Sequence, residues 1–147
     1  MLSSDFHDGN LISISSQNGV FELRVLSRGK LIKITVKDLE RLRVSDFKEG
    51  NVINFLRVFS GEEEMCNEGR YMSLIKYVYD IGDETVESNG KIPLFVSKKI
   101  EELKRGTLLA LEVEPSYGGY VVAIGRAVLE ECRGAESHLE SFADHDS

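Results

Sequence analysis

The sequence predicts an all-β, β-dominated domain: an antiparallel meander of roughly eight strands forming a sandwich or a bent open sheet, with one short helix packed across an end. Apolar and polar residues alternate along 20–25 and again along 32–37, which is the period of a half-buried strand. Turn sequences, of which Asn18-Gly19 is the strongest, separate these segments at short intervals. Only residues 97–105 carry the spacing and end signals of a helix.

In the first half of the chain, turn residues separate the expected strands. These strands cover residues 11–15, 20–26, 31–37, 40–44 and 52–59. Asn18-Gly19 tolerates the left-handed backbone angles of a type I′ hairpin, and Gly29 supplies a positive φ in the next turn. The segment 40–44 is the weakest of these strands, and a helix over 37–44 is the competing interpretation.

In the second half, three further strands flank the predicted helix. They cover residues 70–80, 107–114 and 120–128. The helix over 97–105 has Ser97 as its N-cap and Gly106 just past its end. Because it is short, it must pack on the sheet to be stable. The last two strands form a hairpin, and their nearly continuous apolar runs predict that both of their faces are covered.

Acidic residues are concentrated in two places. The whole chain has a net charge of −7, of which residues 129–147 carry −5. A second cluster, Glu62, Glu63, Glu64 and Glu68, lies in the loop 61–69, and the remainder of the chain carries +2. We therefore divide the chain into a β-rich domain, residues 1–128, and an acidic C-terminal tail, residues 129–147. Such local acidity indicates solvated or partner-facing segments rather than a property of the fold.

Length and composition predict a single soluble domain in the cytoplasm. A chain of 147 residues can bury a core without disulfides. No apolar run approaches the roughly 20 residues of a membrane helix, and residues 1–10 lack the basic and apolar regions of a signal peptide. Cys66 and Cys132 are far apart and match no metal spacing, so we expect two reduced thiols and no membrane interaction.

No group of residues has the pattern of a catalytic or cofactor site. His7-Asp8 is a pair found in metal-dependent phosphohydrolases, but the other histidines, His138 and His145, lie in the acidic tail. Gly118-Gly119 lies in a hairpin rather than before a helix, so it does not form a phosphate loop. We therefore expect a non-enzymatic protein with no catalytic residue, no metal and no cofactor.

Three segments resemble an uncharacterised bacterial family of small β-rich proteins. They are FHDGNLISI (6–14), VKDLERLRVSDFKEGNVI (36–53) and LEVEPSYGGYVVAIGRAV (111–128), which together span about a third of the chain. Domains that begin with such an HD-x-x-L segment recur among the immunity proteins of polymorphic toxin systems. The resemblance implies a β-rich fold and an immunity role, and it carries over no catalytic residue.

These observations predict a protein-binding function. The acidic clusters would steer association with a basic partner such as a nuclease toxin, and an immunity protein or inhibitor blocks its target without chemistry of its own. The expected binding residues are Glu62, Glu63, Glu64, Glu68, Tyr71, Tyr77 and Tyr79.

The alternative is a small-ligand or RNA-binding β-domain. Tyr71, Tyr77 and Tyr79 fall at even spacing in the strand expected over 70–80, where they would form one aromatic face. The segment GGYVVAIGRAVL is also similar to the closing strand of PUA-type RNA-binding domains. Glu101 and Glu102 reduce the net positive charge of the predicted helix, so nucleic acid is the less favoured partner.

Overall fold

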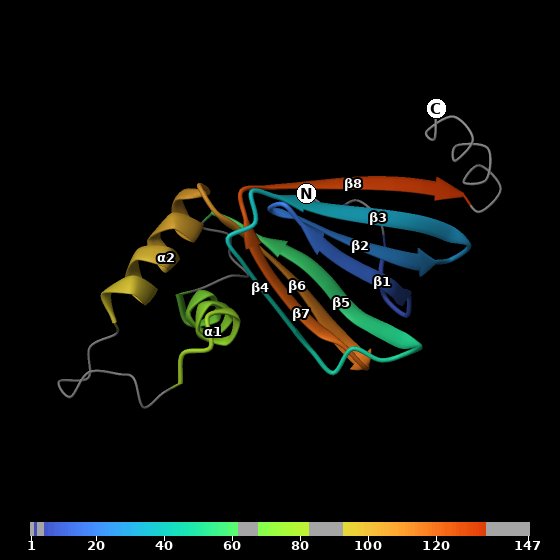
Figure 1. Cartoon of the computed structure of the whole chain (residues 1–147), viewed down its shortest axis with the longest axis horizontal. Coiled ribbons are helices and arrows are strands. Elements are labelled where there is room, and N and C mark those ends of the chain that lie inside the picture. The colour runs from blue at the N-terminus through green and yellow to red at the C-terminus, as the bar shows by residue number, and fades with distance from the viewer. Residues whose placement is uncertain (1, 3–4, 62–67, 83–92, 135–147) are drawn as a thin grey trace.

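A computed structural model describes residues 2, 5–61, 68–82 and 93–134 of the chain. Its strands are β1 (Asn10–Gln17), β2 (Val20–Ser27), β3 (Lys30–Lys37), β4 (Arg41–Ser45), β5 (Asn51–Phe59), β6 (Leu109–Tyr117), β7 (Tyr120–Gly125) and β8 (Ala127–Gly134). Its helices are α1 (Glu68–Val78) and α2 (Leu94–Arg105). The eight strands form one antiparallel sheet in the order β4-β7-β6-β5-β1-β2-β3-β8, which confirms the all-β prediction (Figure 1).

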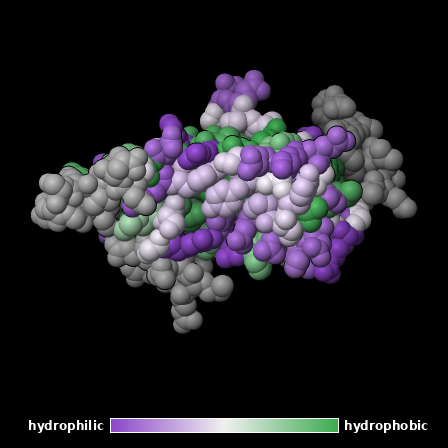
Figure 2. All heavy atoms as spheres, turned by 90° about the horizontal axis from the view of Figure 1, so that it is seen from below, coloured by the Kyte–Doolittle hydropathy of each residue, from purple (hydrophilic) through white to green (hydrophobic). Residues whose placement is uncertain are grey.

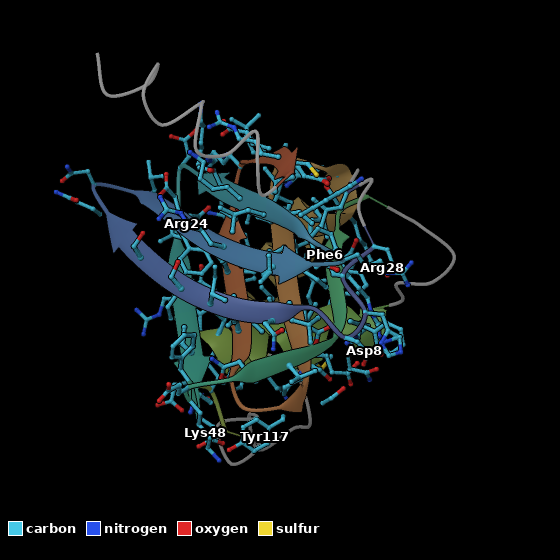
Figure 3. All side chains as sticks on the ribbon, turned by 90° about the vertical axis from the view of Figure 1, so that its right-hand side faces the viewer. Phe6, Asp8, Arg24, Arg28, Lys48 and Tyr117 are labelled. Atoms are coloured by element: carbon cyan, nitrogen blue, oxygen red, sulfur yellow. The ribbon has the colours of Figure 1, made fainter. Side chains whose placement is uncertain are left out.

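The sheet folds into two layers because β1 and β5 pair only at their first residues. Asn10 lies opposite Val52 and Leu11 opposite Asn51, and beyond this point the two strands diverge. The layer β1-β2-β3-β8 therefore crosses the layer β4-β7-β6-β5, as the different strand directions in Figure 3 show. The main core lies between the layers, where alternate residues of β2 and β3 such as Phe21 and Ile34 are fully buried. The sheet is therefore both bent and sandwich-like.

Both turns predicted in the first half of the chain are present. Asn18 and Gly19 have φ angles of 54° and 75°, and Arg28 and Gly29 have φ angles of 52° and 75°. Two consecutive positive φ angles are the signature of the type I′ turn, whose twist matches that of the flanking strands. The weak segment at 40–44 is also a strand rather than a helix, because β4 pairs along its length with β7.

The prediction of a strand over residues 70–80 is wrong, because most of this segment forms the helix α1. Tyr71 and Ile75 are buried together with Leu74 and Val78, and these four positions repeat every three or four residues, as one face of a helix does. A spacing of four residues fits both a strand and a helix, so Tyr71 and Ile75 alone could not distinguish them. Leu74 and Val78 decide between the two, because in a strand they would lie on the face opposite Tyr71 and Ile75, whereas all four residues are buried together.

The predicted helix is present, but it starts earlier and is one of two. Ser97 donates its backbone N–H to the Pro93 carbonyl at 3.2 Å, so it lies inside the helix rather than at its N-cap. Gly106 ends α2 with a left-handed φ of 81°, as expected. Both helices cover the outer face of the β4-β7-β6-β5 layer and form a second core with it (Figure 1).

The strand predicted over 120–128 is two strands that belong to different layers. β7 pairs with β6 in the expected hairpin, and both strands are buried in their apolar parts. At Arg126, whose N–H donates to the Lys37 carbonyl at 3.0 Å, the chain crosses over and continues as β8 beside β3. The boundary placed between residues 128 and 129 therefore falls inside β8. Residues 129–134 belong to the sheet, and the rest of the predicted tail lies outside the described residues.

Candidate protein-binding groove

The three tyrosines among the predicted binding residues do not lie together on one open surface. Glu62, Glu63 and Glu64 lie outside the described residues, and Glu68 is the first residue of α1. Tyr71 is 1% exposed. Tyr77 and Tyr79 are half-buried, and their rings pack edge-on against Tyr120 and Phe95, each with centroids 4.8 Å apart. The three tyrosines therefore do not form the aromatic face on which the RNA-binding alternative depended.

A buried carboxylate lies beneath α1. Glu112 of β6 is 2% exposed, and its two oxygens accept bonds from Arg70 of α1 and from the hydroxyl of Tyr120 on β7, the latter at 2.6 Å. Burial and this bond to the carboxylate raise the pKa of Tyr120. Because both oxygens are occupied by protein partners, the cluster fastens α1 to the sheet and has the geometry of a structural network rather than an acid–base site.

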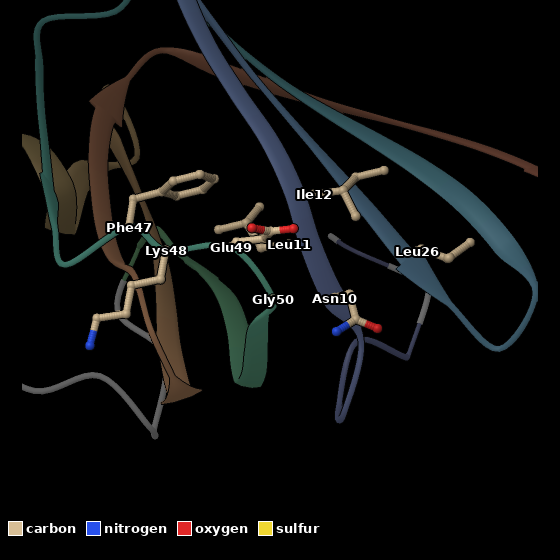
Figure 4. A pocket seen from close by; sticks show the side chains of 8 residues that line it. All are labelled: Asn10, Leu11, Ile12, Leu26, Phe47, Lys48, Glu49 and Gly50. Carbon is tan, nitrogen blue, oxygen red and sulfur yellow. The ribbon is translucent and has the colours of Figure 1, made fainter.

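An open groove of about 600 Å³ lies where the two layers separate (Figure 4). It is lined by Asn10, Leu11, Ile12, Leu26, Phe47, Lys48, Glu49 and Gly50. Three large apolar side chains from β1, β2 and the β4–β5 connection are exposed here: Ile12 at 50%, Leu26 at 42% and Phe47 at 41%. In Figure 4 the Phe47 ring points towards β1, whereas the Lys48 side chain points away from the groove. Lys48 instead lies over the ring of Tyr117, with Nζ 5.3 Å from the ring centroid.

One wall of the groove is shaped by a bulge in β1, and the other is held by hydrogen bonds of a buried asparagine side chain. The pairing of β1 with β2 shifts register between Leu11 and Ser13, so Ile12 occupies a bulge and points outwards. The opposite wall is held by Asn51, which is buried at the start of β5. Its side-chain oxygen accepts the N–H groups of Lys48 and Gly119, at 2.8 and 2.9 Å. The groove is therefore preformed.

One border of the groove is a strand edge. After Leu11, β1 continues to Gln17 with β2 as its partner on one side, and no described strand is registered with its other side. The backbone N–H and C=O groups along such an edge can pair with an added strand. An apolar groove beside an open edge has the chemistry of a peptide- or protein-binding surface. Its lining residues include no serine, threonine, cysteine or histidine.

The sequence contains a signal for this groove that its alternating pattern concealed. Leu11 and Ile12 are adjacent in one strand, as are Val25 and Leu26 in the next. Adjacent side chains of a regular strand point to opposite faces, so one residue of each pair must leave the core. Nothing in the sequence indicated that Phe47 would lie beside Ile12 and Leu26, because its segment was predicted only as a turn.

The charges are separated between the described residues and the rest of the chain. The described residues contain 17 of the 18 Lys and Arg and 15 of the 25 Asp and Glu, a net of +2. Segments 62–67, 83–92 and 135–147 contain the other ten acidic residues and Lys91, a net of −9. The face seen from below in Figure 2 is mostly hydrophilic, with hydrophobic residues in small separate groups.

Among the described residues, no three His, Cys, Asp or Glu side chains come together as metal ligands would. Within the same residues, no helix has the length and apolar character needed to cross a membrane. No protein-family model matches the chain, and neither the curated proteins nor the solved structures contain a significant match to it.

Proposed function

We propose that this chain is a non-catalytic protein-binding domain whose groove receives apolar side chains of a partner protein. The observation that carries the proposal is the convergence of Ile12, Leu26 and Phe47, from three different elements, on one preformed concave surface beside an open strand edge. Exposed apolar residues that are scattered need no explanation, but a concave group of them marks a binding surface.

The specific version of this proposal is an immunity protein or inhibitor that neutralises a basic toxin partner. It is supported by the separation of charge along the chain, because segments 62–67, 83–92 and 135–147 carry a net charge of −9 and the described residues carry +2. Acidic segments accelerate encounter with a basic protein, whereas an apolar groove slows its dissociation. The resemblance of residues 6–14, 36–53 and 111–128 to immunity proteins points to the same role.

The groove is tested by placing a charge in it. Leu26→Asp and Phe47→Asp are each expected to weaken binding to the partner by about 30-fold or more, because a carboxylate would be buried in an apolar contact. The partner to test first is the product of the adjacent gene, and binding is measured by calorimetry with purified proteins. Leu94→Asp is the matched control, since Leu94 is 83% exposed on α2, away from the groove.

Thermal unfolding of the three variants separates loss of binding from loss of fold. If Leu26→Asp and Phe47→Asp bind as tightly as Leu94→Asp, the groove is not the binding surface. If all three variants bind the partner as the parent does and also protect against its toxicity, the inhibitor role survives but acts through another surface.

The acidic cluster makes a separate kinetic prediction. Replacing Glu62, Glu63 and Glu64 together by glutamine is expected to slow association with a basic partner and to reduce its dependence on salt, because the charges act at long range. Stopped-flow association rates between low and physiological ionic strength measure both effects. The sequence predicts a solvent-facing loop here, so stability should change little, because exposed charges contribute little to the free energy of unfolding. Equal association rates for variant and parent at low salt would show that the cluster does not steer binding.

A further inference from the structure

β8 is the outermost strand of its layer, and no described strand lies beyond it (Figure 1). It pairs with β3 without a register shift, from Ala127 opposite Lys37 to Gly134 opposite Lys30. β8 therefore presents a long, regular edge whose outer backbone groups face away from the sheet. The other edge strand, β4, is shorter, with five residues against eight.

The sequence of β8 lacks three of the devices that protect an edge, although it carries the charged residues Glu130, Glu131 and Arg133. Natural edge strands are commonly interrupted by proline, by lysine or by a bulge. AVLEECRG contains neither proline nor lysine, and its ladder with β3 has no bulge. Leu129 is 45% exposed and Cys132 is exposed. Such an edge suits pairing with another strand.

The charges along β8 suit pairing with a second copy of itself. The register with β3 places Glu131 opposite Lys33 and Arg133 opposite Leu31, so both side chains lie on the outer face of the layer. When two copies pair about a twofold axis, opposed residues must share a face. An axis through Cys132 places Glu131 of each copy opposite Arg133 of the other. An axis through Glu131 or Arg133 instead opposes like charges.

We propose that two copies of this chain associate through antiparallel pairing of their β8 strands, about a twofold axis at Cys132. The pairing joins two sheets into one and forms two Glu131–Arg133 contacts between the copies. It does not use β1 or β2, the two strands that line the groove, because β3 lies between β2 and β8. The association and partner binding at the groove therefore use different strands.

Charge reversal tests the register. Glu131→Arg and Arg133→Glu are each expected to weaken the dimer on the order of tenfold, since each variant opposes like charges at two positions. The double variant, with both changes, restores the two opposite-charge contacts and should dimerise like the parent. Sedimentation velocity over a range of protein concentrations measures the dissociation constants.

A matched control accounts for the intrachain contacts of Glu131. Lys33 contacts both Glu131, at 3.4 Å, and Glu22, at 4.0 Å, but Glu22 lies on β2, away from the edge. Glu22→Arg should therefore leave dimerisation unchanged. Thermal unfolding of each variant confirms that the fold is retained.

Cross-linking tests the position of the axis. In a Cys66→Ser chain, diamide should join two Cys132 thiols, because residues directly opposed in antiparallel strands lie within disulfide distance. The new S–S bond forms as the two thiols give two electrons and two protons to diamide. With Cys132→Ser and Leu129→Cys combined, the thiols are six residues apart across the pair and should not be joined.

Several outcomes would overturn the proposal. A monomer at every concentration would do so, as would a dimer that neither single charge reversal weakens. Equal cross-linking at positions 129 and 132 would exclude this axis. If the full chain is monomeric and removal of residues 135–147 makes it dimeric, the edge is occupied by the chain's own C-terminal segment instead.

Discussion

Replacing Asn51 by alanine is expected to lower the free energy of unfolding by about 3–5 kcal/mol, because the variant leaves several buried polar groups without partners. The Asn51 side chain is 2% exposed and joins three segments. It accepts the N–H groups of Lys48 and Gly119, and it donates to the carbonyls of Lys48 and Leu11, the latter at 3.3 Å. Urea-induced unfolding followed by circular dichroism measures the loss.

Two further substitutions make this result specific to the hydrogen bonds. Asn51→Asp keeps an acceptor for the two N–H groups but removes both donated bonds, so it should also be destabilising. Asn54→Ala is the control, because Asn54 lies on the same strand without a side-chain hydrogen bond to any described residue. A loss below about 1 kcal/mol for Asn51→Ala would show that solvent replaces these bonds at little cost.

The Gly125→Ala variant is expected to be destabilised by about 2–4 kcal/mol, since the added methyl group has no space where the chain crosses between layers. A Cβ atom at Gly125 would lie 2.5 Å from Cγ1 of Val36 and 2.8 Å from the Lys37 carbonyl oxygen. The carbonyl belongs to the backbone of β3, which cannot move without disturbing its pairing with β8. Thermal and urea unfolding measure the effect.

The control for Gly125→Ala is a glycine-to-alanine change at a position that no neighbouring strand approaches closely. Gly69 lies exposed in α1, where alanine is the better helix former, so Gly69→Ala should leave stability unchanged or raise it. If Gly125→Ala is as stable as Gly69→Ala, β7 and β8 have room to separate at the crossing. This result would contradict the close approach of β3 to Gly125 at the crossing between the layers.

Local signals predicted the strands and turns of this protein well. The alternation along Phe21, Leu23 and Val25 and the turns at Asn18-Gly19 and Arg28-Gly29 depend on residues close together in sequence, and each is present in the structure. The hairpin of β6 and β7 was predicted for the same reason. These features need no knowledge of distant parts of the chain, because turn geometry and strand period are set locally.

The sequence did not predict where the candidate groove lies. A protein-binding surface was expected on Glu62, Glu63 and Glu64 and on the tyrosines of residues 70–80, but α1 buries Tyr71, and the groove lies elsewhere. Phe47 gave no sequence signal for binding, since its segment contains only turn residues. The position of Phe47 depends on Asn51. The Asn51 side chain forms hydrogen bonds with Leu11, which is 40 positions earlier in the sequence, and with Gly119, which is 68 positions later.

The sequence by itself therefore determined the β-rich class, the hairpins and the segregation of charge, all of which follow from composition and short-range pattern. Only the tertiary structure decided that residues 70–78 are helical, that the chain changes layers at Gly125, and that β8 forms an edge. The physical reason is that each of these choices depends on which distant surface is available to bury the segment. Residues of α1 bury their apolar side against α2 and β7, and β8 finds its partner in β3, nearly one hundred residues earlier in the chain.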